Sequence, residues 1–398
     1  MNRNQVAKEG RKWVEKGILS ESQFKQVLML YPQKNNRSML LIFASIFIGL
    51  GFLTFIASNW SQISDMSRMA IILIALLSFY ISGELVYRNK SKAVGVSLLV
   101  IAVFVFGAGV FLTGQMYHYT FMTAVPFLVW ALAAYLVFGF YQEKVLFITA
   151  IGITTVGQVY SGINYFEFNL WLGLLLLFCF GYFVYHQPSR TYSMLFSISY
   201  LIQSLVLVLA EEHAFYWLLI YLLALYGVGT IGKDRMNGYL LQRASTVAAF
   251  LLVIWQVFFL ENDYAAVRTE GSLFFLISWL VVMGAVVFYI WMKSPMIHAI
   301  TLILFLPVFY LPGASLIALL LLFGFSLGWL LHGYDQEAPE QINRGTIGFV
   351  ISTFVAYTHL AWDFMDKSLF FFIGGVLLFL LSYLLEKKRR KVKRGRAA

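Results

Sequence analysis

From Ser38 onward the chain alternates long apolar runs with short polar ones. A helix needs ~20 mostly apolar residues to cross a bilayer. The uncharged blocks 93–142 and 294–334 are too long for one crossing, so each predicts two helices, hinged near 115–121 and at 312–313. The pattern predicts an all-α, polytopic integral membrane bundle of about 14 transmembrane helices. They are expected over 39–57, 69–87, 93–113, 123–140, 145–160, 169–185, 192–209, 216–231, 244–260, 273–292, two within 294–334, 345–361 and 368–385.

Residues 1–37 have a different pattern, because charges are dense there and apolar residues recur at helical spacing. Gly17 is expected to end a first helix in the left-handed conformation. Ser20 and Gln23 have the spacing of a capping box that opens a second helix. The chain is therefore divided into a cytosolic basic helical hairpin (1–37), a transmembrane helical domain (38–385) and a polybasic cytosolic tail (386–398). A nucleic-acid-binding helix–turn–helix is the alternative for the hairpin, but so short a segment favours a small cap.

Charge placement explains the composition. Only 12% of residues are charged and 60% are hydrophobic, with a mean hydropathy of +0.77, whereas soluble domains carry roughly 25% charged residues. A soluble enzyme is therefore disfavoured. The net charge of +10 suggests nucleic acid at first sight, but alternating the predicted spans puts 26 of the 29 Lys and Arg residues on one side. By the positive-inside rule this predicts that both termini are cytosolic and that nucleic acid is not a partner.

Sequence motifs for common cofactors are missing. The chain has no phosphate-binding loop and no zinc-binding His-Glu-x-x-His,. The spacings Gly-x-Ser-x-Gly (324–328) and Gly-x-Gly-x-x-Gly (227–232) occur only within apolar runs, without the strand–turn–helix context that a nucleophile elbow or a dinucleotide fingerprint requires,. Cys179 is the only cysteine, so no disulfide or CxxC metal site can form. We expect no cofactor, metal or catalytic residue, and an enzyme is the less favoured class.

Polar residues inside apolar spans are the candidates for function, since burying them is costly. Glu84 is the only acidic residue within a predicted span. It predicts either a proton or cation site, or an ion pair with Arg88 one helical turn away, and the ion pair is favoured.

Four further polar residues complete the candidate intramembrane site. Gln115 and His118 lie one helical turn apart in the sequence, so both could face one cavity, although a histidine flanked by tyrosines is typical of an interfacial anchor,. Gln158 and Gln203 are lone amides in other spans. They predict either a shared polar path or ordinary hydrogen bonds between helices.

The tail is strongly basic and directly follows the last predicted span. Such a segment anchors the topology and attracts anionic lipid at the cytosolic face, at ~1 kcal/mol per charge. The expected contacts are Lys387, Lys388, Arg389, Arg390, Lys391, Lys393, Arg394 and Arg396.

The first ninety residues carry a resemblance. It rests on Trp13 followed by 17–20 (Gly-Ile-Leu-Ser), on 49–60 with its Gly-Leu-Gly and Ser-Asn-Trp, and on Arg68 opening the second span. Together they resemble a bacterial family of predicted membrane proteins, domain of unknown function 2157. The resemblance implies a multi-pass protein of the bacterial cytoplasmic (inner) membrane and lends no activity.

Three functions stay open on these observations. The first is a carrier or flippase-like protein for an amphiphilic or lipid-linked substrate, favoured by many spans and short loops. The second is a non-transporting sensor, scaffold or assembly factor. The third is an intramembrane lipid-modifying enzyme. The bilayer is the expected partner, and an unidentified membrane partner or a homo-oligomer stays open.

Overall fold

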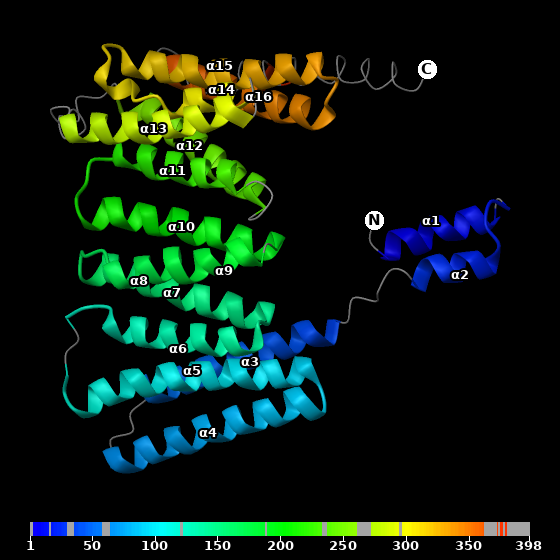
Figure 1. The fold of residues 1–398 in the computed structure, drawn as a ribbon, viewed down its shortest axis with the longest axis vertical. Helices are drawn as coiled ribbons and strands as arrows, with labels where there is room; N and C mark the ends of the chain where they lie inside the picture. Colours follow the sequence, from blue (N-terminus) through cyan, green and yellow to red (C-terminus); the bar gives the residue numbers. More distant parts are fainter. Residues whose placement is uncertain are drawn as a thin grey trace. The chain divides into compact units, whose positions relative to one another are not determined.

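The computed structural model describes residues 3–15, 17–29, 36–57, 64–119, 122–187, 189–232, 237–260, 272–293 and 297–361, with a few positions between 372 and 379. All regular structure in these ranges is helical (Figure 1). The chain divides into two compact units, Met1–Thr120 and Phe121–Ala398. The predicted span 368–385 and the tail 386–398 lie outside the continuously described ranges.

The smaller unit begins with the helical hairpin, α1 (Arg3–Glu15) and α2 (Glu21–Met29). Gly17 has a φ of 67° and follows α1, as predicted. The capping box is also confirmed, because the Gln23 amide donates to Ser20 Oγ at 3.3 Å and the Ser20 amide donates to Gln23 Oε1 at 3.0 Å.

Three long helices complete the smaller unit: α3 (Asn36–Ala57), α4 (Asp65–Asn89) and α5 (Lys92–Met116). α5 is the most buried and packs against both others. Glycine permits one of these approaches, since a Cβ at Gly95 would lie 2.5 Å from the backbone of Tyr87.

The larger unit stacks its helices largely in chain order (Figure 1). Its first part holds α6 (Val125–Tyr141), α7 (Lys144–Asn164), α8 (Leu170–Leu174), α9 (Gly181–His186), α10 (Arg190–Ala210), α11 (Trp217–Ile231) and α12 (Gly238–Phe259). Its second part holds α13 (Leu273–Lys293), α14 (Ile297–Leu302), α15 (Ala314–Asp335) and α16 (Pro339–Ala361).

Hydrogen bonds between connections fix which helix ends lie together in this unit. Gln187 Nε2 donates to Gln142 Oε1 at 2.9 Å, and Arg190 Nε donates to the Tyr239 hydroxyl at 2.9 Å. The connections before α7, α10 and α12 therefore share one end of the stack. At the opposite end, the Phe168 amide donates to Glu211 Oε1 at 2.8 Å.

Two predicted spans of the larger unit are irregular helices. The span expected over 169–185 consists of α8, a π-helical segment η1 (Leu175–Phe180) and α9. The first span of the block 294–334 is broken: after α14 come two 3₁₀ turns, η2 (Ile303–Phe305) and η3 (Val308–Tyr310), on either side of Pro307. Proline has no N–H to continue the helix. Gly313, with a φ of 69°, then opens α15, which confirms the predicted hinge.

Seven described helices are long and apolar enough to cross a membrane by length and composition: Asp65–Asn89, Lys92–Met116, Lys144–Asn164, Arg190–Ala210, Gly238–Phe259, Leu273–Met292 and Ala314–Asp335. Shorter apolar helical stretches run over Val125–Tyr141, Leu170–His186 and Trp217–Ile231. The sequence prediction of apolar membrane helices is confirmed for these segments.

Candidate functional site

A cavity of about 450 Å³ lies among α11, α12, α14, α15 and α16, which is within the size range of small-molecule sites. We call it the arginine cavity. It is lined by Tyr226, Tyr239, Gln242, Arg243, Thr246, Val247, Phe250, Leu251, Ile254, Thr301, Phe325, Trp329, Arg344, Ile347, Gly348 and Ile351.

The polar lining is concentrated where α12 and α16 begin. Arg243 lies near the start of α12 and Arg344 lies near the start of α16. The Arg344 guanidinium lies over the Trp329 ring, 5.7 Å from its centre. Two cationic groups from distant parts of the sequence therefore reach the same end of one cavity.

The remaining lining is apolar and extends away from the arginines along α12. At a rise of ~1.5 Å per residue, the apolar lining from Val247 to Ile254 extends about 10 Å along the helix,. The arginine cavity thus joins a cationic end to an apolar wall.

Close helix packing places Arg344 in the cavity wall. A Cβ at the adjacent Gly345 would lie 2.5 Å from the Leu330 amide nitrogen on α15, and one at Gly333 would lie 2.6 Å from the Ile342 amide nitrogen on α16. α15 and α16 consequently run antiparallel in close contact. The amino-terminal end of α16 and the carboxy-terminal end of α15 meet there, which brings Arg344 to Trp329.

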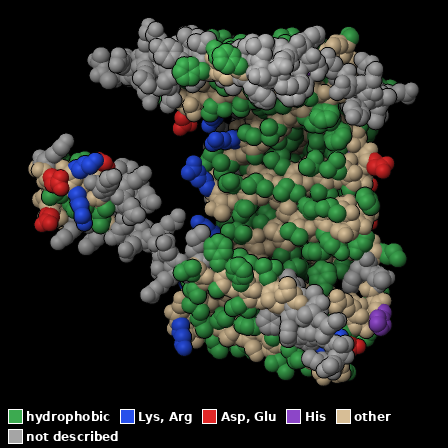
Figure 2. Space-filling model, turned by 180° about the vertical axis from the view of Figure 1, so that it is seen from behind, with side chains coloured by type: hydrophobic (Ala, Val, Ile, Leu, Met, Phe, Trp, Pro, Cys, Tyr) green, Lys and Arg blue, Asp and Glu red, His purple; other side chains and the backbone are tan. Residues whose placement is uncertain are grey.

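Basic side chains gather at one end of the larger unit. Lys144, Arg190, Arg243 and Arg344 lie where their helices begin, while Glu211 lies at the opposite end. Figure 2 shows Lys and Arg side chains along one edge, acidic side chains on both edges and a broad hydrophobic surface between the edges. Asp335 and Glu337, where α15 ends, are acidic residues at the same end as Arg344. We call the end with the four basic residues the basic end.

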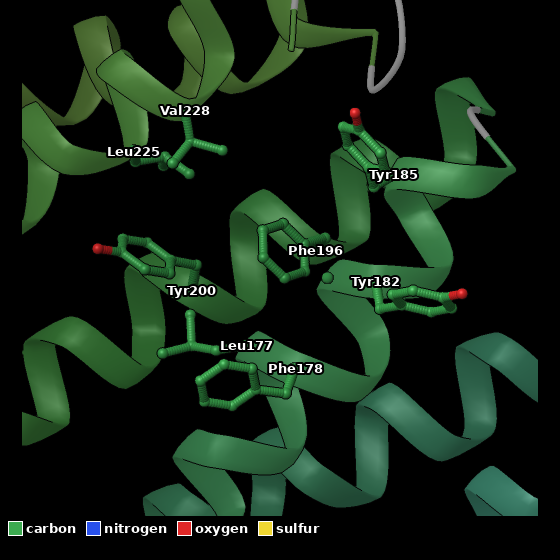
Figure 3. A pocket seen from close by; sticks show the side chains of 9 residues that line it. Leu177, Phe178, Tyr182, Tyr185, Phe196, Tyr200, Leu225 and Val228 are labelled. Carbon is green, nitrogen blue, oxygen red and sulfur yellow. The ribbon is translucent and has the colours of Figure 1, made fainter. Parts of the chain in front are cut away.

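A second cavity, of about 370 Å³, lies beside the π-helical segment between α9, α10 and α11. Figure 3 shows Phe196 and Tyr200 of α10 between Leu177 and Phe178 on one side and Leu225 and Val228 of α11 on the other. The lining residues of this aromatic groove carry no charged group. It suits an apolar chain and offers nothing that would select a headgroup.

Glu84 and Arg88 form the ion pair expected from their spacing, on adjacent turns of α4. Their side chains are 26% and 75% exposed. Such partly exposed pairs on one helix contribute little to stability.

We predict that Glu84→Gln and Arg88→Gln each lower the unfolding free energy by less than about 0.5 kcal/mol, because solvent already screens the pair. Unfolding in detergent measures this, with the double variant to separate the pair from its surroundings. A loss several times larger would contradict the assignment of the pair as an ordinary surface contact.

Gln115 and His118 do not lie on the same helix. α5 ends at Met116, and His118 follows it with a φ of 50°. Both side chains are exposed. The hypothesis that they face a shared cavity stays a prediction, and neither described cavity is lined by them.

Gln158 and Gln203 are both buried, with exposed fractions of 0% and 4%, on helices that pack together. The Gln158 amide pairs with the backbone of Asn169: its nitrogen donates to the carbonyl at 3.0 Å and its oxygen accepts from the N–H at 2.9 Å. Gln203 Nε2 is buried without a hydrogen-bond partner. Nearby, the Thr155 and Ser199 hydroxyls lie 2.6 Å apart. Gln158 and this hydroxyl pair therefore link helices, as predicted for intramembrane amides.

The two amides provide a matched pair of substitutions. Gln158→Leu leaves the Asn169 N–H unpaired, so we predict a loss of between about 1 and 3 kcal/mol. Gln203→Leu removes a buried donor that already lacks a partner and should be neutral or stabilising. Thermal unfolding midpoints in one detergent compare them. Equal destabilisation of both variants would contradict this account of the amides.

Sequence reasoning missed the arginine cavity. Arg243 and Arg344 were counted only as charges that set topology, and their shared cavity depends on how helices a hundred residues apart pack,. No group of three or more His, Cys, Asp or Glu that could hold a metal ion occurs in the described part of the chain. The predicted lipid contacts from Lys387 to Arg396 lie outside the described residues.

The long apolar helices and the split of charge define a multi-pass helical membrane protein,. Residues 11–147 match the family described as "Predicted membrane protein (DUF2157)", which confirms the resemblance seen in the first ninety residues. No curated protein and no solved structure matches the chain. The residues that line the arginine cavity lie beyond the matched segment.

Proposed function

We propose that this protein is a carrier or flippase-like protein for an amphiphilic or lipid-linked substrate, acting through the arginine cavity. The observation that carries the proposal is the combination of a cationic end and an apolar wall in one cavity. An amphiphile has the same division, with a polar head and an apolar chain, so both parts find matching surroundings.

The proposal includes a topology. About 14 helices cross the bacterial cytoplasmic membrane, both termini are cytosolic, and the basic end of the larger unit faces the cytosol. This is supported by the excess of Lys and Arg at that end,. The tail, with its eight basic residues from Lys387 to Arg396, would then contact anionic lipid on the same side,.

Leaflet exchange of a labelled lipid tests the function. Purified protein is reconstituted into liposomes that carry fluorescently tagged phosphatidylglycerol in both leaflets, and dithionite is added outside to bleach accessible tags. We expect the protein to expose the inner-leaflet tags, so that fluorescence falls further than in protein-free liposomes. Bleaching that stops at the outer leaflet with correctly folded protein would contradict the proposal.

A scaffold or assembly factor is the second candidate, and the separate α1–α2 hairpin is the observation that favours it. The hairpin packs on itself, with Gly10 against the Phe24 ring, and carries several charged residues. A scaffold needs the hairpin but not the arginine cavity. Deleting residues 3–29 should leave leaflet exchange intact if transport is the function.

A further inference from the structure

We infer that the arginine cavity binds an amphiphile whose head is an oxyanion such as a phosphate, and that Arg243 and Arg344 hold this head. The inference rests on the proposed function, since it names the chemical class of the substrate. The support for it comes from the hydrogen-bonding groups of the cavity that remain available to a ligand.

Arg344 keeps its positive charge available. Among the described residues it forms one ion pair, with Glu340 at 3.9 Å, and that side chain is 90% exposed. Solvent screens so distant and exposed a pair. The Trp329 ring supports the guanidinium at 5.7 Å without neutralising it,. Arg344 is thus positioned and still has donors to offer.

Arg243 lines the same end of the cavity and has no ion-pair partner among the described residues. Acidic side chains are likewise missing from the described lining. Two guanidinium groups with no carboxylate in the described lining of the cavity attract an anion,. A guanidinium also matches the geometry of a phosphate or carboxylate.

A neighbouring hydroxyl is available as a donor as well. The Tyr239 hydroxyl accepts from Arg190 Nε, so its own proton is free to be donated. An oxyanion accepts hydrogen bonds and donates none, which complements this set.

The apolar wall adds a second requirement for the ligand, beyond the chemistry of its head. Phe250, Ile254 and Ile351 line the cavity on the side away from the arginines. Inorganic phosphate would leave this surface unused, whereas an alkyl chain would cover it. The favoured ligand therefore carries both an oxyanion and a chain.

Binding of three probes to the purified full-length protein in neutral maltoside detergent tests the inference. The probes are decyl phosphate, inorganic phosphate and decyl glucoside. We expect decyl phosphate to bind at least about ten-fold more tightly than either other probe, with each of Arg243→Gln and Arg344→Gln weakening it about ten-fold. Lys144→Gln removes a positive charge at the same end but outside the cavity, so it should leave binding unchanged. Arg243→Lys retains the charge and should keep part of the affinity.

Each alternative result has a distinct meaning. Equal binding of inorganic phosphate and decyl phosphate would replace the lipid-type ligand by a water-soluble anion. Equal binding of decyl glucoside would overturn the oxyanion while leaving an amphiphile carrier intact. Equal weakening by Lys144→Gln would assign the effect to general surface charge. Failure of all three probes to bind, with the protein folded, would count against the inference and the proposed function together.

Discussion

Replacing Thr246 by tryptophan is expected to reduce leaflet exchange by about ten-fold or more, a loss of ~1.4 kcal/mol in the free energy of binding or passage. Thr246 lines the arginine cavity between Arg243 and the apolar wall. Its hydroxyl donates only to the Gln242 carbonyl of the same helix, at 2.7 Å. The substitution therefore removes no hydrogen bond between helices, and the indole occupies the space where head and chain would join.

The matched control is Val156→Trp on α7, whose side chain is exposed and lines neither described cavity. It adds an indole of the same size to an apolar surface and should leave exchange unchanged. The dithionite assay compares the two variants at equal protein-to-lipid ratio. Unimpaired exchange in Thr246→Trp, or equal impairment in both, would exclude the arginine cavity as the route.

Replacing Gly345 by leucine is expected to give the largest loss of stability. A Cβ at this position would lie 2.5 Å from the Leu330 nitrogen and 2.7 Å from its Cα. These are backbone atoms, so relief requires α15 and α16 to move apart. Overpacking of this kind costs between about 1 and 3 kcal/mol. Because Arg344 directly precedes Gly345, binding of decyl phosphate should weaken as well.

Gly152→Leu on α7 is the control, because a Cβ there meets nothing within 4 Å. Leucine also favours the helical conformation over glycine by up to about 1 kcal/mol. Thermal unfolding in detergent should therefore show a lower midpoint for Gly345→Leu and an equal or higher one for Gly152→Leu. A Gly345→Leu midpoint at or above that of the native protein would contradict the close packing of α15 and α16.

Helix positions could be predicted because an apolar run has few alternatives in a bilayer. The uncharged block 93–142 predicted helices over 93–113 and 123–140, and α5 and α6 span Lys92–Met116 and Val125–Tyr141. Single residues with one strong preference were equally informative, as at Gly17 and Gly313. Backbone hydrogen bonds in a helix join residues that are close in the sequence, so local sequence patterns can predict them.

The π-helical segment could not be predicted in the same way. Leu175–Phe180 has the same apolar composition as the regular helices. A distant contact is associated with it, since the Tyr135 hydroxyl donates to the Cys179 carbonyl at 3.0 Å. Such contacts depend on which helices are neighbours, and periodicity carries no information about that.

The arginine cavity escaped prediction for a related reason. Arg243 and Arg344 each begin a span, and the positive-inside rule explained both of them individually. Only the antiparallel packing of α15 and α16 beside α12 brings them to one cavity. Conversely, Gln158 stood out as a polar residue in an apolar span, and in the structure it pairs with the Asn169 backbone.

Labelling of a cysteine inside the arginine cavity tests the central claim most directly. Cys179 is the only native cysteine, so Cys179→Ser gives a background in which Thr246→Cys is the sole thiol. We predict that a water-soluble maleimide labels Thr246→Cys from the basic end of the larger unit, and that decyl phosphate slows this labelling while inorganic phosphate does not. Labelling that proceeds at the same rate with and without decyl phosphate would contradict an amphiphile bound in the arginine cavity.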